Sequence, residues 1–172
     1  MSVASAPRSR PLYTPGQRAR RDSTRWTMVQ AILAPLQFLV FAISLVLVLR
    51  FLWTGTGYGP ATASILLKTA LLYTIMVTGA FWEKAVFGQY LFAPAFFWED
   101  AVSFLVIGLH TLYLYGLLTD GLTPVQLMAV TLAAYAAYAV NATQFLLKLR
   151  RARRESEAPR VATAPRDREL PA

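Results

Sequence analysis

Three carboxylic acids are the residues of this sequence whose types and spacing best suit chemistry. Glu83, Glu99 and Asp100 are three of the four acidic residues between positions 26 and 147, and the single histidine, His110, follows them. Carboxyl groups in apolar surroundings act as general acids and bases, because burial holds one of them protonated. The alternative is that these acids only end helices at the lipid headgroups, where charged side chains are stable.

The acids belong to a stretch, 82–100, that is rich in aromatic rings and contains one glycine and one proline. Its central part, 86–98, is too short to cross a bilayer, which predicts a re-entrant or interfacial segment. Tyr90, Phe97 and Trp98 are among its rings. Such rings either form a belt at the membrane surface or line an apolar slot for a flat amphiphilic ligand.

Polar side chains in the neighbouring apolar segments are candidates to complete a site. Gln30 and Gln37 are seven residues apart and share one helix face, and Gln30 and Asn141 fall in the same half of the membrane as the acids. Four roles are open for His110: it lines the floor of a pocket, binds a tetrapyrrole metal as an axial ligand, carries a proton, or forms a plain interhelical hydrogen bond. No protein-bound metal is expected, because the sequence has no cysteine and one histidine.

Four apolar segments flank and hold the stretch 82–100, and each is long enough to cross a hydrocarbon core of about 30 Å as a helix. The composition is 56% hydrophobic with a mean hydropathy of +0.43, which is too apolar for an ordinary soluble domain. The predicted fold is therefore an all-α integral membrane protein, a bundle of four transmembrane helices with a short re-entrant or interfacial segment between the second and third. The predicted spans are 26–49, 61–81, 101–119 and 125–147, with Lys68 snorkelling outward from the second.

The net charge of +8 comes from the ends of the chain, because 14 of the 17 Lys and Arg residues lie before Trp26 or after Leu147. This clustering favours membrane orientation over nucleic-acid binding, and the positive-inside rule places both termini and the stretch 82–100 on the cytoplasmic side. We predict a basic disordered arm over 1–25, whose prolines break any early helix. A four-helix membrane domain over 26–150 and a disordered charged tail over 151–172 follow.

Several long and unusual strings run through the sequence: Leu12-Tyr-Thr-Pro15, Gln17-Arg-Ala-Arg-Arg-Asp22, Leu33-Ala-Pro-Leu-Gln-Phe-Leu-Val-Phe41, Trp82-Glu-Lys84 and Val86-Phe-Gly-Gln-Tyr-Leu-Phe-Ala-Pro-Ala-Phe-Phe-Trp-Glu-Asp100. Together they resemble the 3-vinyl (bacterio)chlorophyllide hydratases of bacteriochlorophyll biosynthesis. The resemblance covers roughly residues 12–150 and rests on long strings rather than on a short pattern.

The resemblance implies addition of water across the 3-vinyl group of chlorophyllide a or a bacteriochlorophyllide, giving a 3-(1-hydroxyethyl) product without a cofactor. A carboxyl would protonate the terminal vinyl carbon, and a second group would orient the water that attacks the carbon next to the ring. Glu83 or Glu99 is then the expected proton donor, and the other acid or Asp100 positions water. The expected substrate contacts come from Gln30, Gln37, Tyr90, Phe97, Trp98, His110 and Asn141.

The resemblance also implies a bacterial inner, photosynthetic membrane as the location. The expected partners are the pigment, water and the lipid bilayer, with other enzymes of bacteriochlorophyll synthesis as further candidates. One alternative is a non-catalytic membrane protein that holds a tetrapyrrole, and another is a hydratase acting on a carotenoid end group. Buried acids argue against the carrier, because holding a pigment requires no proton donor.

Overall fold

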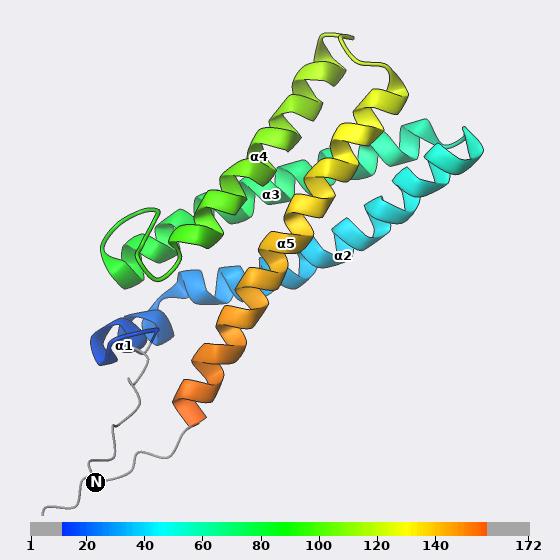
Figure 1. Cartoon of the computed structure of the whole chain (residues 1–172). Coiled ribbons are helices and arrows are strands. Elements are labelled where there is room, and N and C mark those ends of the chain that lie inside the picture. Colours follow the sequence, from blue (N-terminus) through cyan, green and yellow to red (C-terminus); the bar gives the residue numbers. More distant parts are fainter. Residues whose placement is uncertain (1–11, 158–172) are drawn as a thin grey trace, which may run out of the picture.

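Five helices make up the computed structural model, which describes residues 12–157 (Figure 1). The last four are each long and apolar enough to cross a membrane, which confirms the all-α membrane fold with four spans. Each begins before the span predicted from the sequence. The helices are α1 (Pro15–Ser23), α2 (Arg25–Thr54), α3 (Tyr58–Phe87), α4 (Phe97–Leu118) and α5 (Pro124–Glu157).

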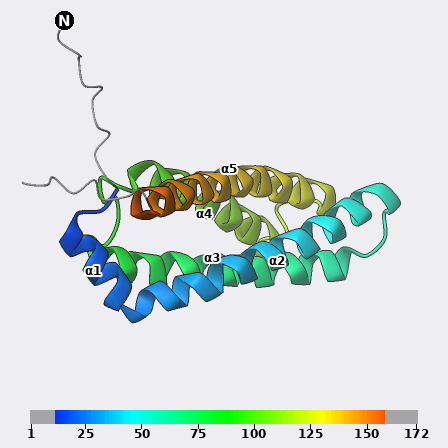
Figure 2. The same ribbon diagram turned by 90° about the horizontal axis from the view of Figure 1, so that it is seen from below.

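The four long helices form two hairpins, α2 with α3 and α4 with α5, which cross each other (Figure 1, Figure 2). The first turn uses Gly55 and Gly57, whose φ angles of 68° and 88° lie in the left-handed region that favours glycine. In the second turn Asp120 adopts a φ of 52°, which aspartate tolerates better than most residues. Each hairpin is closely packed within itself and makes fewer contacts with the other, so a seam runs between them.

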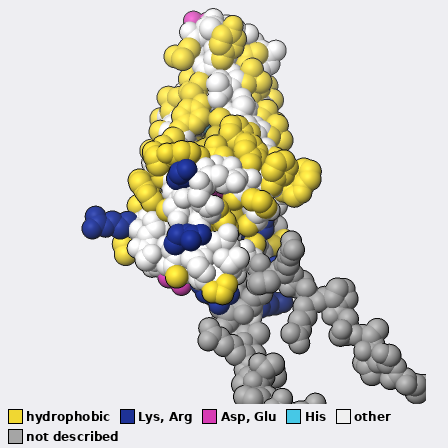
Figure 3. All heavy atoms as spheres, turned by 90° about the vertical axis from the view of Figure 1, so that its left-hand side faces the viewer, with side chains coloured by type: hydrophobic (Ala, Val, Ile, Leu, Met, Phe, Trp, Pro, Cys, Tyr) yellow, Lys and Arg dark blue, Asp and Glu magenta, His cyan; other side chains and the backbone are white. Residues whose placement is uncertain are grey.

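The two hairpin turns lie at one end of the molecule, and α1, the loop 88–96 and the last turns of α5 lie at the other (Figure 1). Figure 3 shows hydrophobic side chains over the upper part of one face, whereas the Lys and Arg side chains visible there lie in its lower half. We call the end that carries α1 the basic end. The acidic stretch lies at this same end.

The segment just before the first span is helical, which corrects the prediction that prolines prevent an early helix. The Thr14 hydroxyl accepts a hydrogen bond from the Gln17 N–H, and the Gln17 side chain accepts one from the Thr14 N–H. Pro15 begins α1 rather than breaking it, because the first helical position needs no N–H donor. Arg20 fixes α1 to α3 by donating two hydrogen bonds, of 2.9 and 2.8 Å, to the carbonyl oxygen of Val86.

At the other end of the chain, α5 continues to Glu157, past the boundary predicted at residue 150. The predicted disorder of 1–11 and 158–172 lies outside the described residues. The division into arm, membrane domain and tail stays a prediction, with the correction that 15–23 and 151–157 are helical.

Candidate functional site

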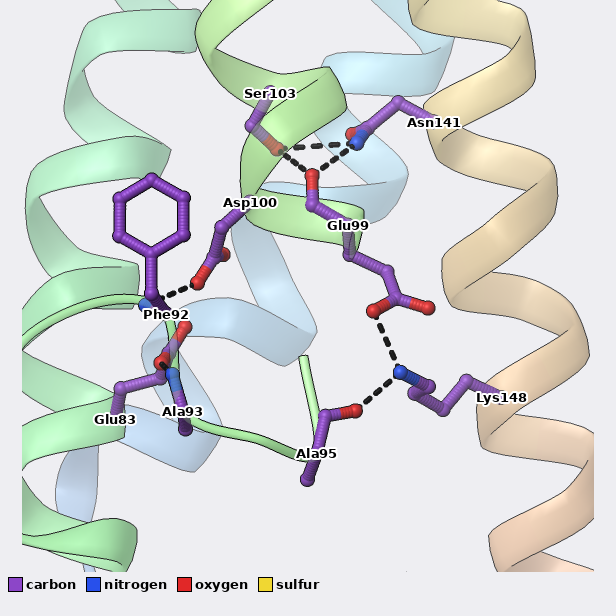
Figure 4. A network of polar contacts seen from close by, with 9 residues as sticks. All are labelled: Glu83, Phe92, Ala93, Ala95, Glu99, Asp100, Ser103, Asn141 and Lys148. Carbon is purple, nitrogen blue, oxygen red and sulfur yellow. Dashed lines mark hydrogen bonds and ion pairs between the residues drawn. The ribbon is translucent and has the colours of Figure 1, made fainter. Parts of the chain in front are cut away.

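The three acids lie where α3 ends and α4 begins, at the basic end of the bundle (Figure 4). Glu83 is near the end of α3, and Glu99 and Asp100 are in the first turn of α4. The loop 88–96 brings these helix ends together. All three acids are buried, with exposed fractions of 4%, 6% and 4%. Burying an acid is costly unless it is protonated, paired or hydrogen-bonded, so the partners of each acid define its chemistry.

Glu83 and Asp100 are held by two successive backbone N–H groups of the loop. The Ala93 N–H donates to Glu83 Oε2 at 3.1 Å, and the Phe92 N–H donates to Asp100 Oδ2 at 2.7 Å. Phe92 has a φ of 57°, an uncommon backbone conformation for an aromatic residue. Strain of this kind persists only where surrounding contacts enforce it. The loop is therefore built around these two carboxyls.

The carboxyl groups of Glu83 and Asp100 also lie close enough to interact electrostatically with each other. Two buried carboxyls in this position repel each other strongly when both are ionised. The arrangement therefore favours an acid pair in which one carboxyl carries a proton.

Glu99 has a different partner. Its Oε2 lies 2.5 Å from the Nζ of Lys148, which also donates a hydrogen bond to the carbonyl oxygen of Ala95 (Figure 4). The ion pair is largely buried and links α4 to α5. An ion pair at this distance is a short, charge-assisted hydrogen bond. The structure thus divides the three acids into a pair and one ion-paired carboxylate.

Asn141 holds the start of α4 in place through the backbone carbonyl group of Glu99. Its Nδ2 donates to the Glu99 carbonyl oxygen at 2.8 Å and to Ser103 Oγ at 3.1 Å, and Ser103 Oγ donates to the Glu99 carbonyl oxygen at 2.8 Å. The structure therefore brings Asn141 to the acids, as expected from its depth in the membrane. Its contacts are with protein groups, which position α4 against α5.

Aromatic rings close the apolar side of the site. Phe96 lies at the centre of this group, with ring centroids at 5.4 Å from Trp82, 5.8 Å from Phe87 and 6.0 Å from Phe145. Tyr13, just before α1, packs on Phe87 and Phe96 and is buried. The site is thus enclosed partly by the segment expected to be a disordered arm.

The three rings expected to bind substrate lie elsewhere. Tyr90, Phe97 and Trp98 are exposed, Trp98 by 71%, and they contact other outward-facing rings rather than the acids. The structure therefore does not bring them together with the acid pair. Gln30 is also apart from the acids, because its Nε2 donates to Thr78 Oγ1 at 2.8 Å and ties α2 to α3.

A second polar group lies between the helices, away from the acids, and we call it the mid-bundle centre: Gln37, Lys68, His110 and Tyr138. Lys68 is fully buried, which corrects the prediction that it snorkels outward. Its Nζ donates to Gln37 Oε1 and lies 3.5 Å from the centroid of the Tyr138 ring. These inward partners hold the ammonium, because cation–π contact partly replaces its hydration.

Two nitrogen atoms of the mid-bundle centre have no hydrogen-bond partner within residues 12–157: Gln37 Nε2 and His110 Nε2. The other ring nitrogen of His110, Nδ1, lies 2.8 Å from the Val106 carbonyl oxygen. If Nδ1 carries the proton, this bond leaves the Nε2 lone pair free. Gln37 and His110 were both expected to contact substrate, and they are the predicted residues that retain unused polar atoms.

The sequence interpretation missed four residues that shape the two polar centres. Lys148 entered the sequence interpretation only in the count of basic residues after Leu147, although it follows Asn141 by seven residues and so shares its helix face. Ser103 follows Glu99 by one helical turn. No periodic signal identifies Lys68 or Tyr13 as buried, because their partners come from other helices.

Comparison with known proteins identifies close relatives. The model of the 2-vinyl bacteriochlorophyllide hydratase family matches residues 13–151. The 2-vinyl bacteriochlorophyllide hydratase of Cereibacter sphaeroides is 70% identical over 154 residues, covering 90% of this chain and 95% of the relative. The protein of the same name from Rhodobacter capsulatus is 64% identical over 157 residues, covering 91% of each. No solved structure matches.

Proposed function

The chain belongs to the 2-vinyl bacteriochlorophyllide hydratase family, and from this we propose that it adds water across the vinyl group of a bacteriochlorophyllide at the Glu83–Asp100 pair. It is a multi-pass membrane hydratase, a hydro-lyase of bacteriochlorophyll biosynthesis. The observation that supports the proposed site is the pair of buried carboxyls held side by side by two successive backbone N–H groups. When one carboxyl is protonated, the pair places a transferable proton beside a proton acceptor.

Hydration delivers one proton to carbon and removes one from water. Protonated Glu83 donates to the terminal vinyl carbon, and the π electrons of the double bond form the new C–H bond. The positive charge left on the carbon attached to the macrocycle spreads over the conjugated system. Water attacks that carbon, and Asp100 takes the proton that the water loses. Proton transfer from Asp100 to the neighbouring Glu83 then restores both carboxyls to their starting forms.

The contacts favour Glu83 over Glu99 as the donor. Glu99 is ion-paired with Lys148, and an ionised carboxylate has no proton to give. Within the acid pair, Asp100 accepts the shorter backbone hydrogen bond, 2.7 Å against 3.1 Å. Stronger N–H donation favours the charged form, which leaves the proton on Glu83. Glu99 and Lys148 then hold the start of α4, and with it Asp100, in place.

The remaining expected residues take roles that fit their contacts. Gln37 and His110 contact the pigment through their unused nitrogens, whereas Gln30 and Asn141 position helices. Tyr90, Phe97 and Trp98 meet the flat macrocycle as it arrives from the bilayer, since exposed rings at a membrane surface suit an amphiphile. Measurements of kcat, KM and pigment affinity can distinguish these three roles: pigment contact, helix positioning and pigment entry.

We place both termini on the cytoplasmic side of a bacterial inner, photosynthetic membrane. The support is the basic end of the bundle, because Lys and Arg near the spans favour the cytoplasmic side. In this orientation the acid pair lies at the cytoplasmic end, where other enzymes of bacteriochlorophyll synthesis can deliver the pigment.

A labelled-water assay tests the proposal. The purified protein in lipid membranes is given a vinyl bacteriochlorophyllide in isotopically labelled water, and the pigment is analysed by mass spectrometry. We expect label in the hydroxyethyl product, and none in a carotenoid offered in parallel. Pigment that binds and stays unchanged would instead support a carrier. For the change of an acid to its amide at Glu83, Asp120→Asn is the matched control, because Asp120 is exposed in the α4–α5 turn, away from the acids.

A further inference from the structure

The mid-bundle centre contains a buried lysine that has no acidic partner among the described residues. Lys68 is fully buried, and its described partners are the Gln37 amide oxygen and the Tyr138 ring. The ion pairs of Arg21 with Asp22 and of Lys148 with Glu99 both involve other residues. Burial disfavours the ammonium form of a lysine unless an anion lies beside it, so an anion bound here would stabilise the charged form of Lys68.

A second donor at the same place indicates the shape of the missing group. Gln37 Oε1 accepts from Lys68, while its Nε2 is buried and has no partner among the described residues. An ammonium and an amide N–H side by side match the two oxygens of a carboxylate. An ester oxygen accepts hydrogen bonds from these donors more weakly than a carboxylate oxygen does, because an ester carries no charge.

We propose that Lys68 and Gln37 bind the propionate carboxylate of the pigment, so that the protein selects the free acid over its esters. This inference rests on the proposed function. A bacteriochlorophyllide carries this side chain as a free carboxylate, whereas an esterified bacteriochlorophyll does not. Lys68 therefore determines specificity, and it makes no contact with the reacting vinyl carbons.

The placement of the centre suits one pigment that reaches both sites. Its residues come from all four long helices and lie on the seam between the two hairpins: Gln37 on α2, Lys68 on α3, His110 on α4 and Tyr138 on α5. Tyr138 precedes Lys148 by ten residues, so it lies about 15 Å deeper along α5 than the residue that pairs with Glu99. The vinyl and propionate groups project from different pyrrole rings, which requires two separated binding sites.

His110 gives independent support for a pigment at this seam. It lies near enough to Lys68 for an electrostatic interaction, and its Nε2 is buried without a described partner. Metal-binding histidines commonly commit the other ring nitrogen to a carbonyl oxygen, as Nδ1 does here with Val106. The magnesium of the pigment and its carboxylate would together complete the unpaired groups of the centre.

The test compares a bacteriochlorophyllide with its methyl ester, using the full chain in lipid membranes. Pigment affinity is measured by absorption titration, and hydration by product formation. We expect wild-type protein to favour the free acid over the ester by about tenfold or more in both affinity and kcat/KM. In Lys68→Met the preference falls to near one. Lys84→Met, which removes an exposed lysine, keeps the wild-type preference.

A second variant covers the case in which Lys68→Met does not fold. Gln37→Glu supplies Lys68 with an internal carboxylate, which pairs the charge and blocks the pigment carboxylate, so the preference should again be lost. Equal use of acid and ester by wild-type protein would overturn the inference while hydration itself stands. A wild-type protein that hydrates neither pigment would overturn the proposed function, and the inference with it.

Discussion

The acid site, which contains Glu83, Glu99 and Asp100, differs from the mid-bundle centre in how its buried polar groups are paired. At the acid site, Glu83 and Asp100 have backbone donors and each other, and Glu99 has Lys148. In the mid-bundle centre, two nitrogens have no described partner and one ammonium has no described anion. The polar side chains named in both centres are largely buried in the same bundle, so the difference is not one of exposure.

This contrast separates two tasks. Groups that are satisfied by the protein are held in a fixed geometry before substrate arrives, which suits proton transfer. Groups left unsatisfied cost stability, about 1–3 kcal/mol for each buried polar atom, and a ligand that satisfies them recovers that energy as affinity. We therefore expect changes at the acid site to alter rate or stability, and changes in the mid-bundle centre to alter binding.

The largest expected effect is on rate at the acid pair. Glu83→Gln should lower kcat by about 100-fold to 10,000-fold, because it removes the transferable proton. The glutamine oxygen still accepts from the Ala93 N–H, so the loop stays anchored and pigment affinity is kept. Hydration rate and absorption titration measure the two quantities separately. Full activity in a folded Glu83→Gln protein would exclude Glu83 as the donor.

The next effect is on stability, and it compares two buried lysines. Lys148→Met leaves the Glu99 carboxylate without its partner and should cost about 2 kcal/mol of unfolding free energy. Lys68→Met removes an ammonium that has no described anion, so unfolding should be unchanged or slightly harder. Denaturation in detergent measures both. Equal losses would show that Gln37 and Tyr138 alone satisfy Lys68.

Hydropathy predicted the fold well because a membrane span requires only length and apolarity. It also brought the acids and Asn141 together correctly, since a four-span chain returns the end of the fourth helix to the depth where the third begins. Such depth arguments assign residues to a layer of the membrane. They do not say which side chains face one another, which explains why Glu99 was not separated from the acid pair in advance.

The failures follow from partners that are remote in sequence. In the sequence, Lys68 resembles a lysine that snorkels to the membrane surface. Its partners in the structure are Gln37, 31 residues earlier, and Tyr138, 70 residues later, on other helices. Pro15 resembles a helix breaker unless Thr14 and Gln17 are recognised as a capping box, a signal that was present in the sequence. Lys148 resembles a membrane-orienting charge because it is the first of five basic residues within 148–154.

A smaller effect is expected for the histidine of the mid-bundle centre. His110→Leu removes the unpartnered Nε2 and should weaken pigment affinity by about tenfold, with little loss of stability. The pigment's absorption band should also shift between wild type and variant if the ring contacts its metal. An unchanged affinity and spectrum would return His110 to a purely structural role, through its bond to Val106.

The smallest effect tests the rings outside both centres. Trp98 is 71% exposed, whereas Phe96 is buried among rings beside the acids. Trp98→Leu should change KM by about twofold and leave kcat unaltered, since exposed substitutions rarely exceed about 0.5 kcal/mol. A large fall in kcat would mean that Trp98 turns inward when pigment binds. The geometry of the acid site would then depend on bound pigment. The distinction between a preformed acid site and a ligand-dependent mid-bundle centre would no longer hold.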